Sequence, residues 1–187
     1  LRRAIPILII VFLAVIAVSR GLALMNDRDD VERQARGILS LAAGQLSHAV
    51  ALTRAPGEVD GNEPDAEAWN AIVSEIAAAG ALNRDHVLLV ADGDLTVRAA
   101  TPSGARWQGL AIETFIAGGQ PLFLFGARAG VMEVTIAGEP WLAAVNLPGE
   151  RQGAAVAMIA QDAVFAEWRE TATFNITLFV ATAAVLL

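Results

Sequence analysis

Few side chains in this sequence have the types and spacing that catalysis or metal binding requires. The chain has no cysteine, which excludes disulfides, thiolate nucleophiles, iron–sulfur clusters and cysteine-based zinc sites. Its two histidines, His48 and His86, are far apart in the sequence and lack metal-ligand spacing. The most prominent carboxylates are scattered, without a convincing acid–base pair: Glu75, Asp85, Asp92, Asp94 and Glu133. We therefore predict no catalytic residue and no metal site.

One stretch imitates a catalytic motif. Residues 47–56 read SHAVALTRAP and are similar in outline to the phosphoacceptor box of histidine kinases. That box has an acid directly after the histidine, whereas this chain has Ala49, and the proline spacing also differs. No P-loop and no G-x-G-x-x-G sequence is present. We interpret His48 as a histidine on the polar face of a helix.

Arginine carries a different signal, because a guanidinium binds a carboxylate through two parallel hydrogen bonds. Arg98, Arg106 and Arg128 occur in the central part of the chain. Trp107 and Trp141 could supply the apolar wall of a ligand pocket. The alternative is that the arginines are surface residues and the tryptophans are core residues.

The composition points to membrane segments at the two ends of the chain. Hydrophobic residues make up 55% of the 187 positions, and the mean hydropathy is +0.51. This apolar excess is concentrated near the two ends. The net charge of −7, from 20 acidic and 13 basic residues, disfavours nucleic acid as a partner. The length fits one domain with a few extra helices.

The N-terminal segment is typical of a membrane anchor. An uncharged run extends from Ala4 to Ser19, and a second short apolar piece ends at Met25, so the two together can span a bilayer with some tilt. Arginines precede the run and acids follow it, which predicts a cytoplasmic N-terminus and an external segment after about Met25. A cleavable signal peptide is the competing interpretation. We favour an uncleaved anchor, because no clean small-x-small cleavage site precedes a plausible mature start.

Helical periodicity continues beyond this anchor. Apolar residues between 27 and 54 fall on one arc of a helix with a 3.6-residue period. This amphipathic helix packs on its own domain or forms the stalk of a dimer. Different parts of the helix can also do one and the other. Residues 55–64 have the composition of a loop, and residues 65–80 predict a second helix.

The sequence period then changes to 2, which is typical of strands. Residues 86–91 and 95–100 surround the turn DGD and predict a hairpin. Short helical turns and an irregular apolar connection follow. Three more strands are expected at 131–137, 140–147 and 154–160. The expected fold class is therefore α+β.

The last helix begins polar and becomes apolar. We expect Asp162 as its N-cap, Trp168 at a membrane interface and a wholly apolar run after Thr173. A small domain cannot surround such a helix with protein, so the run predicts the start of a second span that returns to the cytoplasm. Because the chain begins with leucine and stops inside this run, we expect a fragment trimmed at both ends.

The order of two strands, short helices and three strands resembles an extracytoplasmic PAS or PDC sensor domain. Three stretches carry the resemblance: HVLLVADGDLTVRAATP, GLAIETFIAGGQPLFLFGARAGVMEVTIAGEPWLAAVNLPG and GAAVAMIAQDAVFAEWRE. More narrowly, QPLFLFGARAGVMEVTI followed by WLAAVNLPG is similar to the sensory part of membrane-bound PAS-containing histidine kinases of alphaproteobacteria. The resemblance covers residues 83–170. It implies a five-stranded antiparallel sheet with helices on one face that enclose a pocket.

The resemblance also implies a candidate site. Arg106 and Arg128 fall in the connections that roof the pocket in PAS-like folds, and Trp107 and Trp141 would form its wall. These four residues are the candidate ligand-binding residues. No metal ligand or cofactor is expected in this chain, since ATP and magnesium would belong only to a kinase region beyond the second span.

The expected organisation has five parts. They are a first transmembrane helix (1–25), a stalk helix (26–56), a linker with a second helix (57–82), a PAS-like sensor domain (83–162), and an exit helix that starts a truncated second span (163–187). With this topology, residues 26–173 lie outside the bacterial inner membrane. His48 would then lie on the wrong side of the membrane for a kinase phosphoacceptor.

These features predict the input half of a dimeric two-component sensor histidine kinase. Its external domain would bind a small molecule or a periplasmic protein, and its missing cytoplasmic region would act on a response regulator. One alternative keeps the sensor and changes the output to a diguanylate cyclase or a chemoreceptor. Another alternative is a membrane-anchored scaffold that binds a protein and has no small-molecule pocket.

Overall fold

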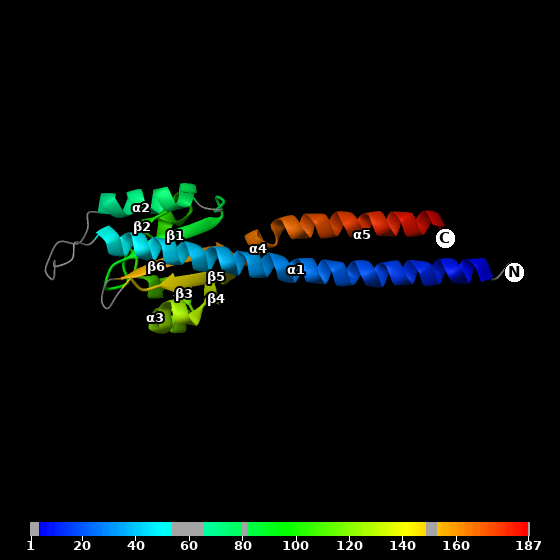
Figure 1. Cartoon of the computed structure of the whole chain (residues 1–187), viewed down its shortest axis with the longest axis horizontal. Helices are drawn as coiled ribbons and strands as arrows, with labels where there is room; N and C mark the ends of the chain where they lie inside the picture. The colour runs from blue at the N-terminus through cyan, green and yellow to red at the C-terminus, as the bar shows by residue number, and fades with distance from the viewer. Residues whose placement is uncertain (1–3, 54–65, 80–81, 149–152, 187) are drawn as a thin grey trace. The chain divides into compact units, whose positions relative to one another are not determined.

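Figure 1 shows the computed structural model, which describes four stretches of the chain: residues 4–53, 66–79, 82–148 and 153–186. The chain divides into two compact units. The helix unit combines Leu1–Gln34 with Val164–Leu187, and the sheet unit comprises Ala35–Ala163. The loop expected at 55–64 lies outside the described residues. Helix α1 (Ala4–Thr53) is continuous, so the expected anchor and the expected stalk form one helix that contributes to both units.

The sheet unit is built on one curled antiparallel sheet. Its strands lie in the order β2-β1-β6-β5-β4-β3. The strand bounds are β1 His86–Ala91, β2 Val97–Ala100, β3 Ile116–Ala117, β4 Val131–Ile136, β5 Glu139–Asn146 and β6 Ala154–Ala160. The first strand and the last strand therefore lie side by side near the middle of the sheet.

The sheet has six strands where five were expected. The additional strand is β3, which pairs only two residues with β4, Ile116 with Ile136 and Ala117 with Thr135. Two residues between short helices give no measurable alternation in the sequence, so this strand has no period-2 signal. The other five strands are confirmed, although β2 begins at Val97 because Thr96 forms only an isolated bridge with Ala111.

A buried carboxylate organises the turn between β1 and β2. Oδ1 of Asp92 accepts hydrogen bonds from the backbone N–H of Asp94 (3.0 Å) and of Thr96 (2.8 Å). Its Oδ2 accepts one from Nε of Arg98 at 2.6 Å. The Asp92 residue is 0% exposed, so these donors replace the water that a carboxylate needs. The expected hairpin is thus confirmed, and its turn is fixed by a side chain.

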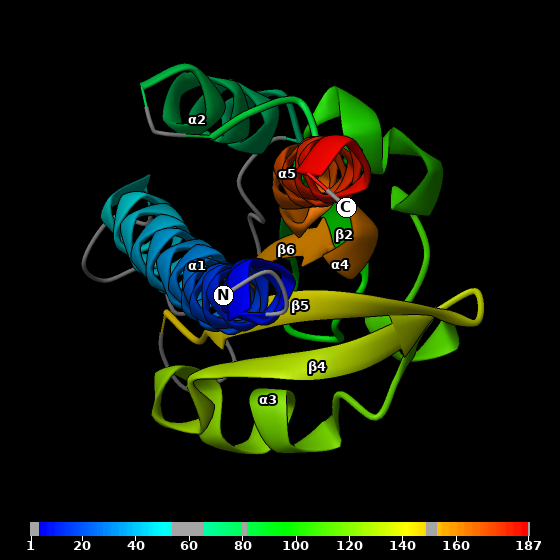
Figure 2. The same ribbon diagram turned by 90° about the vertical axis from the view of Figure 1, so that its right-hand side faces the viewer.

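Helices cover both faces of this sheet, whereas the resemblance implied helices on one face only. The main core lies under η1 (Pro102–Trp107), η2 (Ile112–Thr114), α3 (Gln120–Phe125) and η3 (Gly126–Ala129). The cyan end of α1 and α2 (Ala66–Ala79) lie on the opposite side, and Figure 2 shows β5 and β4 between α1 and α3. Every residue of β1 is consequently buried.

Helix α1 packs on the sheet unit along the face that the sequence predicted. Leu39 and Leu46 are fully buried, while Leu41 and Leu52 on the other side of the helix are exposed. The guanidinium Nη1 of Arg36 donates to the carbonyl of Val131 at 2.7 Å and so ties the helix to the start of β4. The packing confirms the amphipathic helix, and the dimer stalk stays a prediction.

In the helix unit, α5 (Ala166–Leu186) lies beside the first part of α1 and runs in the opposite direction. Nε1 of Trp168 donates to the carbonyl of Leu24 at 3.1 Å. The guanidinium of Arg28 lies 5.1 Å from the ring centroid of Phe165. One groove between the two helices is lined by Phe12, Leu13, Ile16, Arg20, Asn175, Leu178, Phe179 and Thr182.

One expectation about the C-terminal part needs correction, and the second span stays a prediction. The single helix expected from Asp162 is two helices, α4 (Gln161–Val164) and α5, and Asp162 lies in the first turn of α4 instead of capping it. Among the described residues, α1 is the one helix that is long and apolar enough to cross a membrane, a test that a signal sequence also passes. Helix α5 does not reach that level, because charged residues occupy its first turns.

Candidate functional site

Three of the four predicted site residues meet inside the sheet unit. The buried ring of Trp107 stacks on Phe115 with 5.2 Å between centroids and meets Trp141 edge-on at 5.7 Å. The guanidinium of Arg106 lies 4.2 Å from the centroid of the Trp107 ring, within cation–π range. Trp107 belongs to the buried core of the sheet unit, and Phe115 and Trp141 pack against that core. The apolar surface that was expected to face a ligand is therefore in contact with other side chains.

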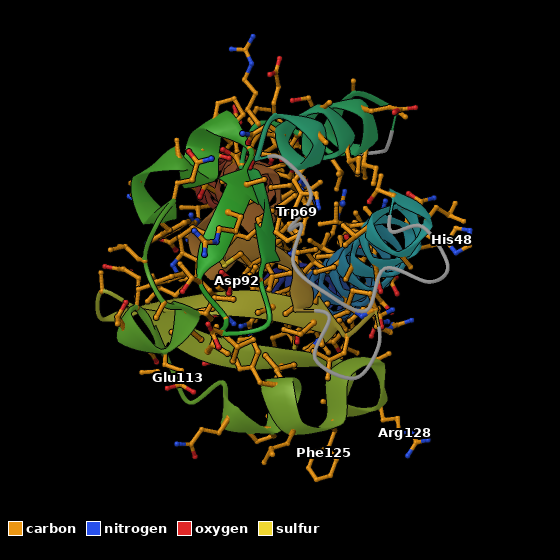
Figure 3. All side chains as sticks on the ribbon, turned by 90° about the vertical axis from the view of Figure 1, so that its left-hand side faces the viewer. His48, Trp69, Asp92, Glu113, Phe125 and Arg128 are labelled. Carbon is orange, nitrogen blue, oxygen red and sulfur yellow. The ribbon has the colours of Figure 1, made fainter. Side chains whose placement is uncertain are left out.

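Arg128 lies apart from this aromatic cluster. It is exposed in η3, and Figure 3 shows its side chain, like that of Phe125, pointing away from the sheet. The two cavities of the sheet unit described below are lined by other residues. The structure therefore joins Arg106 to the two tryptophans but does not bring Arg128 to them.

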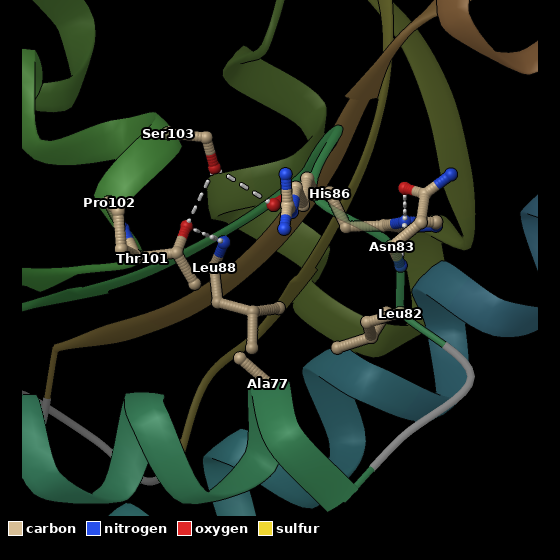
Figure 4. A pocket seen from close by; sticks show the side chains of 9 residues that line it. Ala77, Leu82, Asn83, His86, Leu88, Thr101, Pro102 and Ser103 are labelled. Carbon is tan, nitrogen blue, oxygen red and sulfur yellow. Dashed lines mark hydrogen bonds between the residues drawn. The ribbon is translucent and has the colours of Figure 1, made fainter.

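A groove of about 590 Å³ opens on the other side of the sheet, between α2, the start of β1 and the turn that follows β2 (Figure 4). We call it the His86 groove. Its apolar lining consists of Ala77, Leu82, Leu88 and Pro102. Its polar lining consists of Asn83, Arg84, His86, Thr101 and Ser103. The size and the mixed lining are typical of small-molecule sites.

His86 is the buried polar side chain of this groove. It is 8% exposed, and Figure 4 shows its ring beside Asn83. The backbone N–H of Asn83 donates to Nδ1 at 3.1 Å, and Oδ1 of Asn83 lies 2.6 Å from the same nitrogen. Within the described residues, Nε2 is buried and has no hydrogen-bond partner. Native proteins rarely leave such an atom unpaired, so a water, a ligand or a residue outside the described ranges is expected to supply its partner.

Burial lowers the pKa of His86 below its ordinary value of 6.5, because loss of water disfavours the charged imidazolium. The negative charge of Asp85 and a hydrogen bond to the Asn83 backbone act in the opposite direction and are weaker. The imidazole is therefore neutral at neutral pH. A neutral ring that keeps one unused nitrogen can hydrogen-bond a ligand without a large charge penalty.

Two hydroxyls fix the opposite wall of the groove. Oγ of Ser103 donates to the carbonyl of His86 at 3.1 Å and lies 3.1 Å from Oγ1 of Thr101. Oγ1 of Thr101 accepts a hydrogen bond from the backbone N–H of Leu88 at 3.2 Å. These contacts connect η1 to β1 near its start. The groove wall is thus held in place by hydrogen bonds and is not a loose surface loop.

A second cavity of about 650 Å³ lies between η2, β3 and α3. Among the described residues that line it, Glu113 is the one charged residue, and Gly118 and Gly119 also belong to the lining. None of its side chains is a buried polar group without a partner. This cavity has less recognition chemistry than the His86 groove.

Metal and phosphotransfer chemistry find no support in the described part of the chain. No group of three histidine, aspartate or glutamate side chains lies close enough there to hold a metal ion. His48 is exposed on α1 in Figure 3, as expected for a polar-face histidine. A comparison with protein families and with curated proteins finds no match for this chain.

The sequence did not identify the His86 groove. In the sequence, His86 is one of two isolated histidines. Whether it lines a groove depends on which face of β1 is covered by α2, and the sequence does not give this. The one available signal was a histidine at the first position of a strand that is otherwise wholly apolar. In such a strand, a polar side chain has to find a specific partner.

Proposed function

We propose that this chain is the sensory and membrane-spanning part of a bacterial receptor. In this proposal, the sheet unit lies outside the inner membrane as a PAS-like sensor, and both of its ends lead into the membrane. Its output is a histidine kinase of a two-component system, in a cytoplasmic region beyond this chain. The strand order and the short helices between β2 and β4 support the PAS-like assignment.

The pairing of α5 with the apolar part of α1 carries this proposal. Leu178 and Phe179 line the same groove as Leu13 and Ile16, which lie in the candidate span. If that part of α1 is in the membrane, α5 lies in the membrane beside it. Helix α5 then forms the second span, and Trp168 lies near the interface, where tryptophan is enriched.

The exposed surface of the helix unit supports a lipid environment. Large apolar side chains of both helices are more than half exposed: Ile7, Leu8, Ile10, Val11, Phe12, Val15, Val18, Leu22 and Met25 on α1, and Phe174, Ile176, Leu178, Val180 and Val185 on α5. Burial of apolar area contributes about 25 cal/mol per Å², so such a surface is unfavourable in water. Hydrocarbon chains of lipid would cover it.

The hydroxyls of α5 are also arranged as lipid requires. Thr173, Thr177 and Thr182 each donate to the carbonyl four residues earlier at 2.8 Å. Polar side chains in a bilayer need such internal partners because no water is available. This bonding pattern lets three threonines occupy an apolar span.

The proposed signal path runs from β6 to α5. Strand β6 is paired on both sides, with β1 and with β5, and Gln161 of α4 follows its last residue directly. A ligand that favours one arrangement of the sheet would therefore change the exit helix of the sensor. Such a ligand acts only through its different affinity for the two arrangements.

The receptor class leaves two alternatives for the output and one for the input. A diguanylate cyclase or a chemoreceptor would use the same sensor and spans. A protein-binding scaffold is favoured by a separate observation, since Leu124 and Phe125 of α3 are exposed apolar residues of the sheet unit. We propose the histidine kinase first, because two stretches between Gln120 and Gly149 resemble the sensory part of membrane-bound histidine kinases. In all cases a homodimer is expected, with the exposed Leu41 and Leu52 of α1 as candidate contacts.

Cysteine cross-linking in native membranes tests this proposal, because the chain has no cysteine of its own. Ile16→Cys with Leu178→Cys is expected to give an intramolecular disulfide, since both residues line one groove. Ile16→Cys with Val180→Cys is the matched control, because Val180 is as exposed as Leu178 but is not among the described residues that line the groove. Release of an uncross-linked chain by alkaline washing would instead show that the N-terminal helix is a cleaved signal and would contradict the proposal.

A further inference from the structure

We propose that the His86 groove binds a small carboxylate with a short apolar body. Its carboxylate accepts hydrogen bonds from Nε2–H of His86 and from the guanidinium of Arg84, and its apolar body lies against Leu82 and Leu88. The role of this ligand as a signal rests on the proposed sensory function. The binding site itself is argued from the groove alone.

The unpartnered nitrogen is the first reason. Nε2 of His86 has no hydrogen-bond partner among the described residues, although the residue is more than nine-tenths buried and lines the groove. A buried polar atom without a partner is unfavourable by as much as a lost hydrogen bond. A ligand atom in the groove removes this cost.

The contacts of the other ring nitrogen decide what kind of ligand atom fits. The N–H of Asn83 donates to Nδ1, which requires the neutral ring to carry its proton on Nε2. Oδ1 of Asn83 can accept from Nδ1–H in the charged ring, where both nitrogens carry protons, and in the other neutral tautomer, where Nε2 is an acceptor. An anion beside Arg84 favours the forms with a proton on Nε2, because that N–H can then donate to it. For these forms the matching ligand atom is an acceptor.

The charge of the groove makes this acceptor a carboxylate. Among the described residues of the lining, Arg84 is the one cationic side chain and none is a carboxylate. Asp85 is next to it in the chain but does not line the groove. A guanidinium recognises a carboxylate through parallel hydrogen bonds, and charge-assisted bonds are about twice as strong as neutral ones. An anionic oxygen thus uses both Arg84 and His86.

The remaining lining sets the size and polarity of the ligand body. Ala77, Leu82, Leu88 and Pro102 present apolar surface, and the groove volume of about 590 Å³ admits a small molecule. A few polar contacts that orient a ligand in an apolar cleft are the usual design of such sites. Because His86 and Leu88 belong to β1, which pairs with β6, the ligand would touch the strand beside the exit strand of the sensor.

Histidine NMR on the full chain in detergent tests the proposal. The chain has two histidines, so ring labelling gives two sets of signals, and His48→Gln assigns them. Butyrate is the probe, and butyramide is its uncharged counterpart. Butyrate is expected to shift the Nε2 signals of His86 saturably and to leave those of the exposed His48 unchanged. Butyramide is expected to have little effect.

Two exposed arginines provide matched variants. Arg84→Gln is expected to weaken butyrate binding about tenfold or more, because a hydrogen bond to a charged group is lost. Arg128→Gln removes an equal charge away from the groove and is expected to leave the affinity unchanged. Both side chains are exposed, so both variants are expected to fold.

Three results would overturn the carboxylate site. They are equal shifts of both histidines, no saturable shift of His86, or an unchanged affinity in Arg84→Gln. A loss of affinity in Arg128→Gln alone would place the anion at η3 and would also overturn it. None of these outcomes alters the α1–α5 cross-link, so failure of this site and failure of the proposed receptor are distinguishable.

Discussion

Two buried polar residues, Asp92 and His86, have opposite roles in the sheet unit. Asp92 satisfies the turn of a hairpin with all of its acceptors engaged by backbone and arginine donors. His86 has the opposite character, since one of its nitrogens is used and the other is not. The first residue stabilises the sheet unit, and the second leaves it with an unused recognition group.

The buried histidine predicts a dependence of stability on pH. Well above pH 6.5, the ordinary pKa of histidine, His86 is neutral in both the folded and the unfolded chain. As the pH falls below 6.5, the unfolded chain binds a proton that the folded chain binds only at its lower pKa, so the free energy of unfolding decreases. Urea unfolding between pH 8 and pH 5, values chosen around the ordinary histidine pKa of about 6.5, measures this decrease.

His86→Gln is expected to reduce the decrease, because the titrating ring is gone. His48→Gln serves as the control, since that histidine is exposed. A decrease that is the same in both variants would show that burial of His86 is not its cause.

Asp92 predicts a large loss of stability on truncation. Asp92→Ala removes the buried carboxylate that accepts from two backbone N–H groups and Arg98, and we expect the free energy of unfolding to fall by about 2–4 kcal/mol. Asp94→Ala, two residues along and exposed, is expected to change it by less than about 0.5 kcal/mol. Equal effects in the two variants, measured by thermal denaturation, would contradict the assigned role of Asp92.

At the level of elements, the sheet depends on a close approach at the start of β6. A Cβ on Gly153 would lie 2.0 Å from the carbonyl oxygen of Ala91, and its φ of +88° is unfavourable for other residues. Gly109 has a similar φ of +80°, yet nothing lies within 4 Å of its Cβ position. A substitution at Gly109 therefore introduces backbone strain alone, whereas one at Gly153 introduces both strain and a steric clash.

Alanine at these two positions gives the corresponding prediction. Gly109→Ala is expected to cost about 1–2 kcal/mol of stability through strain alone. Gly153→Ala is expected to cost at least about 3 kcal/mol, because β1 and β6 must also move apart. Thermal denaturation of both variants provides the comparison. A smaller loss of stability in Gly153→Ala than in Gly109→Ala would show that Gly153 does not lie so close to the carbonyl of Ala91.

Much of the element order follows from sequence periodicity, and the departures have physical causes. Alternation predicted five strands, and the amphipathic arc predicted the buried face of α1 with Leu39 and Leu46. Strand β3 was missed because two residues have no period. The His86 groove was missed because it depends on which helix covers β1. The ligand-binding roles of Arg106 and Arg128 stay predictions, because a connection between strands gives no register from which side-chain positions follow.

At the level of the whole molecule, the proposed function assigns the two units to two different solvents. The helix unit exposes large apolar side chains between Ile7 and Met25 of α1 and between Phe174 and Val185 of α5. The sheet unit buries its apolar strands under helices on both faces and keeps its arginines 84, 106 and 128 exposed. The proposed receptor, with an aqueous sensor and a membrane-embedded transmitter, would need such a contrast.

The most direct test of this account is the reactivity of single cysteines in intact cells toward a maleimide that cannot cross the inner membrane. We predict that Ser40→Cys, exposed in the sheet unit, reacts from outside. Ala181→Cys, in the apolar part of α5, is predicted to stay unreacted until detergent dissolves the membrane. Labelling of both positions in intact cells, or of neither before lysis, would contradict a two-span receptor with an external sensor.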